Sequence, residues 1–444
     1  MTTDKENKSR LLVTREGVSY VLPFIVVTCC FALWGFANDI TNPMVKAFSK
    51  IFRMSVTDGT LVQVAFYGGY FCMALPAALF IRRHSFKSGI VMGLSLYALG
   101  VLLFIPARAM GSFAPFLVAY FILTCGLSFL ETTANPYILL MGDRETATRR
   151  LNLAQSFNPI GSLAGMFVAM NFIQARLSPL DTAQRAVLGD AEFEVLKQSD
   201  LAVLSQPYTL LGIVLVLMLV LMQLVRIPAV HQAARENHEP LWPAVKRLWG
   251  NRAYRRGVVA QFFYVGAQIT CWTFIIQYGT RIFMAEGMSE QAAEVLSQRY
   301  NIVAMVLFCM MRFVNIWLMK YFKDARLLTF FAAVAIVLLC GVIFVGGRVG
   351  IYCLVAVSAC MSLMFPTIYG LALGNVQEDA ELGSAGLIMA ILGGSLLPAV
   401  QAMIIDSSVQ ALPAVNLSFV VPMVCFVVVM AYGYLCSLRS QFKV

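Results

Sequence analysis

The sequence is poor in charged residues. Asp, Glu, Lys and Arg together make up only 13% of its 444 residues, whereas 59% are apolar. Soluble domains usually carry about 25% charged residues, which help to cover their surface. A water-soluble fold of this composition would leave much apolar surface facing water. The composition therefore argues against a soluble protein and favours one that lies in a membrane.

Several motifs that mark other protein classes are also missing. The chain has no phosphate-binding G-x-x-x-x-G-K motif, which argues against ATP-driven transport by this chain alone. It has no histidine cluster with metal-ligand spacing and no nucleophile elbow, so we expect no metal site and no enzyme activity. The 11 cysteines show no C-x-x-C spacing and lie in apolar runs, where we expect them to act as small hydrophobic residues.

Long apolar runs are abundant. A helix that crosses a bilayer needs roughly 20 apolar residues. Runs of about this length, bounded by charge, Pro or Gly, occur near residues 20–42, 60–81, 88–107, 113–141, 151–174, 207–226, 257–281, 297–321, 326–345, 350–376, 382–404 and 414–437. The sequence therefore predicts an all-α membrane protein with twelve transmembrane helices.

The twelve runs form two sets of six. We predict a cytoplasmic N-terminal tail (1–19), a first six-helix half (20–226), a basic cytoplasmic linker (227–256), a second half (257–437) and a cytoplasmic tail (438–444). The fifth and eleventh runs share a weak Gly- and Pro-containing likeness. It is typical of the parallel repeats of the major facilitator architecture, although chance similarity between Gly-rich helices is the alternative.

The positions of the positive charges predict the orientation. With both termini in the cytoplasm, the inside segments hold 22 Lys and Arg residues and the outside loops hold 10. Cytoplasmic loops of membrane proteins carry an excess of Lys and Arg. The net charge of +10 is thus explained by topology, and we expect a lipid bilayer and no nucleic acid as a partner.

Polar side chains inside the spans are few, and they gather on stripes with helical spacing. Such residues are costly in a bilayer and usually face the bundle interior or a water-filled cavity. They are Trp34, Asn38, Asp39 and Asn42 in the first span, Glu131 and Asn135 in the fourth, Asn152, Gln155, Asn158 and Ser162 in the fifth, Gln261, Tyr264, Gln268 and Trp272 in the seventh, and Arg312 in the eighth.

A cavity lined by amides, hydroxyls and aromatic faces suits a neutral polyol such as a sugar. Amides match the donors and acceptors of sugar hydroxyls, and a ring such as Trp34 or Trp272 packs on the apolar C–H face. The alternative for the amides is hydrogen bonding between helices, and for the tryptophans it is core packing. Arg312 could be an ion-pair partner, a gate or a substrate ligand. Gly161 and Gly165 predict close helix packing.

Asp39 and Glu131 predict coupling to an ion gradient. Burial disfavours the ionised form of a carboxyl group, so a buried carboxylate can take up and release protons near neutral pH. A carboxylate could equally bind sodium together with amide oxygens. The structural alternatives are a buried ion pair for Glu131 and a helix-end polar residue for Asp39.

Six segments resemble the L-fucose:proton symporter family of the major facilitator superfamily. They are FALWGFAND at 31–39, AFYGGYF at 65–71, LETTANPY at 130–137, LNLAQSFN at 151–158, AQFFYVGAQITCW at 260–272 and SLMFPTI at 362–368. The resemblance extends from about residue 18 to 437. It implies that Glu131 acts in proton coupling and sugar binding, and that Gln155 and Asn158 contact the substrate. A key aspartate of the family falls at Asn42 here, and Asp39 lies one turn earlier on the same face.

The resemblance and the residues together predict a sugar:cation symporter. We expect L-fucose:proton symport by alternating access in the bacterial inner membrane, by a protein that functions as a monomer and needs no cofactor beyond the coupling ion, H⁺ or Na⁺. Substrate contacts are predicted for Gln155, Asn158, Asn38, Asn42, Asn135 and Gln268. Relatives that carry glucose, galactose or N-acetylglucosamine, some of them using sodium, are the nearest alternative. A sugar sensor that does not transport and a channel are alternatives from other classes.

Overall fold

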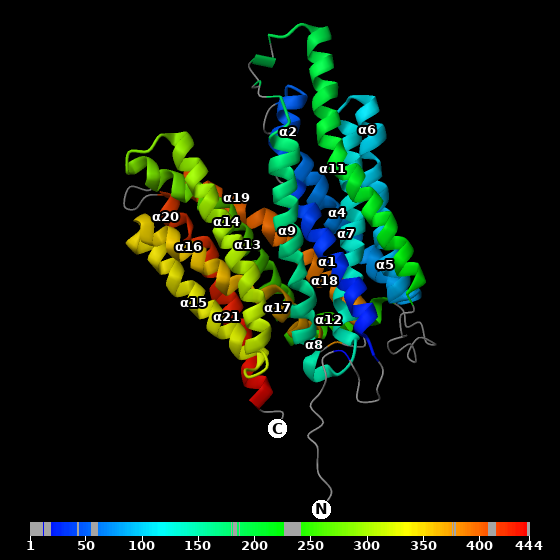
Figure 1. Cartoon of the computed structure of the whole chain (residues 1–444). Coiled ribbons are helices and arrows are strands. Elements are labelled where there is room, and N and C mark those ends of the chain that lie inside the picture. The colour runs from blue at the N-terminus through cyan, green and yellow to red at the C-terminus, as the bar shows by residue number, and fades with distance from the viewer. Residues whose placement is uncertain are drawn as a thin grey trace, which may run out of the picture. The chain divides into compact units, whose positions relative to one another are not determined.

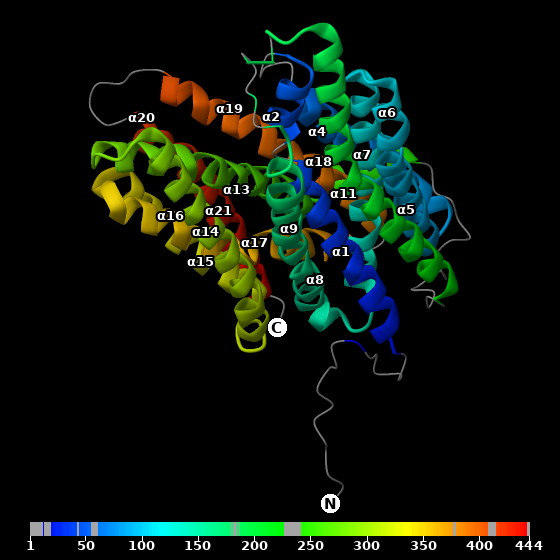
Figure 2. The ribbon, with the colours of Figure 1, turned by 45° about the horizontal axis from the view of Figure 1, so that its top comes forward.

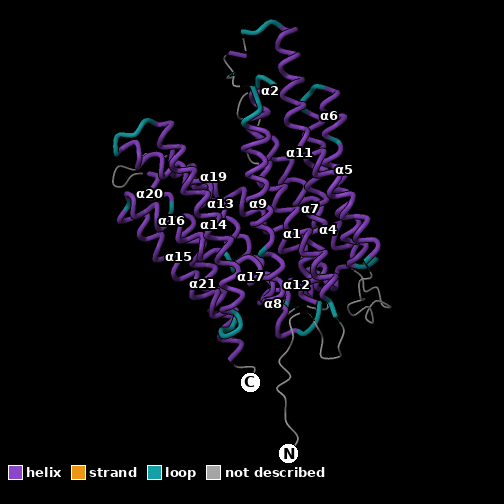
Figure 3. Tube along the Cα trace, viewed as in Figure 1, coloured by secondary structure: helices purple, strands orange, loops and turns teal. Residues whose placement is uncertain are grey.

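A computed structural model describes residues 12, 19–41, 44–54, 61–178, 180, 184–185, 187–225, 241–374, 376, 379–406 and 414–441. Figure 3 shows that nearly all of these residues are helical. Among them, twelve helical segments are long and apolar enough to cross a membrane. The prediction of twelve spans is therefore confirmed.

The chain forms two compact units. The N-terminal unit holds the described residues of 19–138 and 157–232, and the C-terminal unit holds those of 139–156 and 233–444. The stretch 139–156, which the sequence places in the first half, thus packs with the spans of the second half. The domain boundaries predicted from the sequence stay a prediction.

The N-terminal unit is a helical bundle. Its elements are α1 (Val21–Thr41), α2 (Met44–Ile51), α4 (Leu61–Arg83), α5 (Phe86–Leu102), α6 (Phe104–Met110), α7 (Ala114–Leu140, whose last two residues belong to the other unit), α9 (Phe157–Val168), a π-helical turn (Ala169–Gln174) and α11 (Asp190–Leu224). In Figures 1 and 2, α1 and α9 run side by side.

Glycines bring α1 and α9 into close contact. A Cβ added to Gly161 would lie 1.8 Å from the Ala32 carbonyl oxygen, and one added to Gly165 would lie 2.5 Å from the Phe36 oxygen. On α1, a Cβ at Gly35 would lie 2.1 Å from a backbone oxygen of α9. Only glycine allows the two backbones to approach this closely. The predicted close packing at Gly161 and Gly165 is confirmed.

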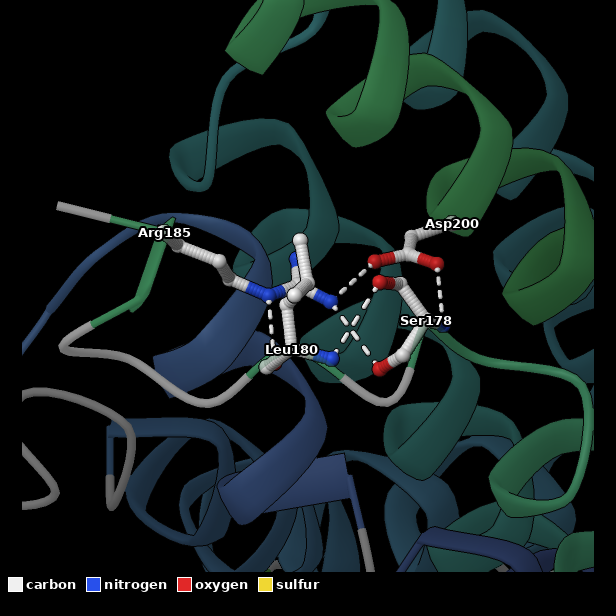
Figure 4. Close-up of polar contacts among 4 residues, drawn as sticks. All are labelled: Ser178, Leu180, Arg185 and Asp200. Atoms are coloured by element: carbon white, nitrogen blue, oxygen red, sulfur yellow. Dashed lines mark hydrogen bonds and ion pairs between the residues drawn. The ribbon is translucent and has the colours of Figure 1, made fainter. Parts of the chain in front are cut away.

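Between the predicted fifth and sixth spans, the mixed charge of the sequence indicates a loop, but residues 190–206 are helical. α11 begins at Asp190 and continues past Pro207, so it starts well before the predicted span. Within it, Asp200 accepts a hydrogen bond of 2.6 Å from Arg185 Nη2 and one of 2.9 Å from the Ser178 N–H (Figure 4). Arg185 also donates to the Leu180 carbonyl at 3.0 Å. This buried ion pair fastens the segment before α11 to the helix.

The C-terminal unit contains the other spans. Its elements are the 3₁₀ turn Arg144–Thr146, α8 (Ala147–Gln155), α12 (Leu241–Gly250), α13 (Arg252–Ala285), α14 (Glu290–Leu318), α15 (Asp324–Cys340), a π-helical turn (Gly341–Val345), α16 (Gly347–Met361), α17 (Met364–Leu373), α18 (Ala380–Met389), a 3₁₀ turn (Ala390–Leu392), α19 (Gly393–Asp406), α20 (Ala414–Ser418) and α21 (Val420–Gln441). α13 packs against α14, α17, α19 and α21 and so forms the centre of this unit.

Large apolar side chains on the outer helices point away from the protein. Val337 on α15 is 70% exposed and Leu217 on α11 is 64% exposed. In water these faces would be unfavourable, but in a bilayer they meet lipid chains of the same polarity. The exposed apolar faces therefore support the assignment as an integral multi-pass membrane protein.

Candidate functional site

A tyrosine of α4 contacts one of the two carboxylates predicted from the sequence. Glu131 on α7 is 4% exposed, and its Oε1 accepts a hydrogen bond of 3.3 Å from the Tyr70 hydroxyl. Its second oxygen, Oε2, is buried and has no hydrogen-bond partner among the described residues. Tyr67 lies one turn earlier on α4, and Asp39 on α1 is half-buried. Tyr70 thus joins α4 to α7 through the Glu131 carboxylate.

The contact between α4 and α7 places Tyr70 beside Glu131. The Ser128 hydroxyl donates to the Tyr70 carbonyl at 2.9 Å. A Cβ on Gly69 would lie 2.0 Å from Thr124 Oγ1, so the absence of a side chain there lets the helices close. Small and hydroxylated residues at such contacts are typical of membrane helices. The carboxylate partner is therefore positioned by a rigid helix pair.

Three of the remaining candidates in the N-terminal unit have partners within the protein. Asn158 donates through Nδ2 to the Phe31 carbonyl at 3.2 Å, and Asn135 donates to the Glu131 carbonyl at 3.0 Å. Trp34 is 4% exposed and stacks on Phe31 with ring centroids 4.6 Å apart. The Asn158 bond joins α9 to α1, whereas the Asn135 bond lies within α7, and Trp34 packs in the core. Asn38 is half-buried.

The polar stripe of the fifth span is divided at Ser156. Ser156 is the single residue between α8 and α9, and its hydroxyl donates to the Asn152 carbonyl at 2.8 Å. Before this residue, α8 belongs to the C-terminal unit, and Asn152 Nδ2 lies 3.4 Å from Thr367 Oγ1 on α17. Arg312 Nη1 on α14 donates to the carbonyl oxygen of Gln155 at 2.5 Å. Arg312 is therefore a partner of the α8 backbone.

The ring of Phe308 lies against Arg312. Its guanidinium carbon lies 4.9 Å from the ring centroid of Phe308, within cation–π range. Trp272 meets the same ring edge-on at a centroid distance of 5.0 Å, and its Nε1–H donates to Ser358 Oγ at 3.1 Å. Phe308 thus brings together two of the predicted residues. Gln268, one turn before Trp272 on α13, is half-buried.

The structure sorts the predicted residues into two groups. The N-terminal unit holds Trp34, Asn38, Asp39, Glu131, Asn135 and Asn158; the C-terminal unit holds Gln155, Gln268, Trp272 and Arg312. Asn42 lies outside the described residues. Their roles stay predictions. Groups of three or more His, Cys, Asp or Glu side chains that could share a metal ion do not occur in the described part of the chain.

Three further residues were not predicted from the sequence: Tyr67, Tyr70 and Phe308. Tyrosines three apart in an otherwise apolar run were the available signal for the pair on α4, because a hydroxyl in a bilayer needs a partner. Phe308 carried no signal, since one phenylalanine in an apolar run resembles any other.

Comparison with known proteins places the chain. The sequence profile of the Major Facilitator Superfamily matches residues 27–398. The L-fucose-proton symporter of Haemophilus influenzae is 49% identical over 426 residues, covering 94% of this chain and 96% of that protein. The glucose/galactose transporter of Brucella abortus is 31% identical over 427 residues, covering 96% of each. A solved structure of the Escherichia coli fucose:proton symporter matches with a TM-score of 0.85 at 30% identity, covering 94% of this chain and 99% of that one. The chain thus belongs to the Major Facilitator Superfamily and, within it, to the L-fucose-proton symporter family.

Proposed function

We propose that this protein takes up L-fucose together with protons by alternating access. The relative from Haemophilus influenzae, an L-fucose-proton symporter, supports this substrate, because the two chains share 49% identity over nearly their full lengths. Transport of this kind needs a substrate site and an ionisable group that senses the proton gradient. The predicted residues offer candidates for both.

The observation that carries the proposal is the setting of Glu131. Its carboxyl group is buried in a transmembrane helix, with one oxygen beside Tyr70 and the other without a partner among the described residues. An ionisable group in this position is costly, which favours a functional role. A proton is the smallest ligand that neutralises the carboxylate, so Glu131 is the proposed proton carrier. Asp39, half-buried on α1, is the proposed second coupling residue.

The exposure of the polar groups sharpens the proposed sugar contacts. Asn38 and Gln268 are both half-buried, so their amides can reach a ligand. Asn158 has its Nδ2 on a backbone carbonyl, which leaves its Oδ1 to accept from a sugar hydroxyl. For stacking, Trp272 is the better candidate because it is partly exposed, whereas Trp34 is buried against Phe31. Gln155, Asn135 and Asn42 stay further candidates.

A glucose or galactose substrate is the second candidate function. It is favoured by the Brucella abortus relative, a glucose/galactose transporter, but at 31% identity this relative is more distant than the fucose symporter. Sodium as the coupling ion belongs to the same alternative. We further propose that the protein works as a monomer in the bacterial plasma membrane.

The test is counterflow in proteoliposomes. Labelled L-fucose, glucose, galactose and N-acetylglucosamine are each offered under an imposed proton gradient, an imposed sodium gradient, or neither. We expect exchange of L-fucose, and its accumulation only when the proton gradient is present. Accumulation of glucose or galactose without exchange of L-fucose would refute L-fucose as the substrate and support the second candidate function. No exchange of any sugar would overturn both.

A further inference from the structure

α12 carries two exposed tryptophans on one face. Trp242 is 75% exposed and Trp249 is 71% exposed. They are seven residues apart, close to two full turns, so they lie on the same side of the helix. Ala244 and Leu248, on the other side, are buried. The helix thus packs through one apolar face and presents a second one outward.

The helix is held firmly in this orientation. Arg247 forms two hydrogen bonds with Asp379 at the start of α18, from Nε at 3.0 Å and from Nη2 at 2.9 Å. At its end, the Asn251 N–H donates to the Arg247 carbonyl at 3.0 Å. Asn251 Oδ1 accepts from the first residues of α13, so it caps that helix. Because one residue joins α12 to α13, α12 cannot rotate freely about its own axis.

Positive charge flanks the tryptophan face. Lys246, Arg252, Arg255 and Arg256 are all exposed, and residues 241–256 contain no Asp or Glu. α13, which starts at Arg252, is one of the segments able to cross a membrane. α12 therefore lies one residue from a membrane span, within reach of the bilayer surface.

We infer that α12 is an interfacial anchor, whose Trp242 and Trp249 insert at the headgroup level of a leaflet containing anionic lipid. Tryptophan is enriched at membrane interfaces because its ring is apolar and its N–H is polar. A short amphipathic helix with basic flanks binds by apolar burial together with attraction to anionic headgroups. The Arg247–Asp379 pair connects this anchor to α18, so lipid composition acts on the C-terminal unit.

Fluorescence quenching by brominated lipids tests the insertion in the full-length protein. It is reconstituted in liposomes of phosphatidylglycerol and phosphatidylcholine, with bromine placed either near the headgroup or deep in the acyl chain. We expect that W242F/W249F removes mainly the part of the emission quenched by shallow bromine. W272F is the control, because Trp272 lies near the middle of the membrane span Arg252–Ala285, away from the headgroups. If shallow bromine quenches the wild type and W242F/W249F equally, the two tryptophans do not meet lipid headgroups and the proposal is overturned.

The contribution of charge has its own test. In nanodiscs containing phosphatidylglycerol, the melting temperature of the wild type should exceed that in pure phosphatidylcholine. K246Q/R255Q/R256Q should lose about half or more of this difference, whereas the charge-conserving K246R/R255K/R256K should keep it. If both triple variants keep the full difference, anionic lipid does not act through α12 and the electrostatic part of the proposal fails.

Discussion

Glu131 and Arg312 are buried ionisable side chains with incomplete hydrogen bonding. Glu131 has one oxygen on Tyr70 and the other without a partner among the described residues; Arg312 donates to the Gln155 carbonyl while its Nε is left without one. An unmet buried polar atom costs free energy, so a ligand or a second conformation that supplies the missing partner is favoured. Such an atom does not by itself mark a functional residue, because Arg185, which forms a buried ion pair, also has one at Nη1 within the described part of the chain.

The hydrogen bond from Arg312 gives a prediction at this scale. Arg312→Gln should lower the free energy of unfolding by about 1.5–3 kcal/mol, because a charged donor to a buried carbonyl is lost. Arg312→Lys, which keeps the charge, should lose less. Arg326→Gln, on an exposed site of α15, is the control and should stay within about 0.5 kcal/mol of the wild type. Thermal unfolding in detergent compares the stability of all three variants with that of the wild type. If Arg312→Gln is as stable as the wild type, the hydrogen bond makes no net contribution to stability.

At the scale of elements, the pairing of α1 with α9 depends on glycine. Gly161→Ala puts a Cβ where the structure leaves 1.8 Å to the Ala32 oxygen, so the helices must separate. We expect a loss of about 1–3 kcal/mol or more in stability, typical of overpacking. Gly250→Ala is the matched control, since nothing lies within 4 Å of its added Cβ. The two variants are compared by melting temperature, and equal values would contradict close packing as the role of Gly161.

The ion pair before α11 gives a second prediction for an element. Arg185→Met leaves Asp200 buried without its cation and should cost about 3–5 kcal/mol, whereas Arg185→Met with Asp200→Leu should recover part of that loss. The surface pair Arg348–Glu286 is the control, and Arg348→Gln should cost below about 1 kcal/mol. Unfolding of the four proteins measures this, and a double variant no more stable than Arg185→Met would refute the pairing argument.

These elements also show how far the sequence carries. Span number and the close packing at Gly161 could be predicted, because apolar length and small-residue spacing are local signals. The start of α11 was missed because charged residues before Pro207 look like a loop until Asp200 meets Arg185. The contact of Tyr70 with Glu131 was missed since it joins residues 61 positions apart. Such pairs are set by tertiary packing, for which one sequence holds no periodic signal.

For the whole molecule, the course of the chain between the two units is informative. The chain passes from the N-terminal unit to the C-terminal unit within α7, after Ile138, and returns after Ser156, at the turn between α8 and α9. The helix that carries Glu131 therefore continues covalently into the C-terminal unit, and the fifth span also contributes to both.

The buried carboxyl group of Glu131 predicts how this residue acts in the transport cycle. A permanently neutral side chain at this position should still allow the loaded protein to exchange sugar, but it can no longer release a proton. Glu131→Gln should therefore retain L-fucose counterflow and lose all accumulation driven by a proton gradient. It should also lose the alkalinisation of the medium that we expect when L-fucose is added to wild-type proteoliposomes. Tyr70→Phe is the matched control, because it keeps the carboxyl group and removes only its donor, so accumulation should be weakened but present. A proton gradient can drive a conformational cycle only through a group whose proton affinity differs between the two conformations of the protein. If Glu131→Gln accumulates L-fucose like the wild type, that group is not Glu131. Asp39 is then the first residue to test.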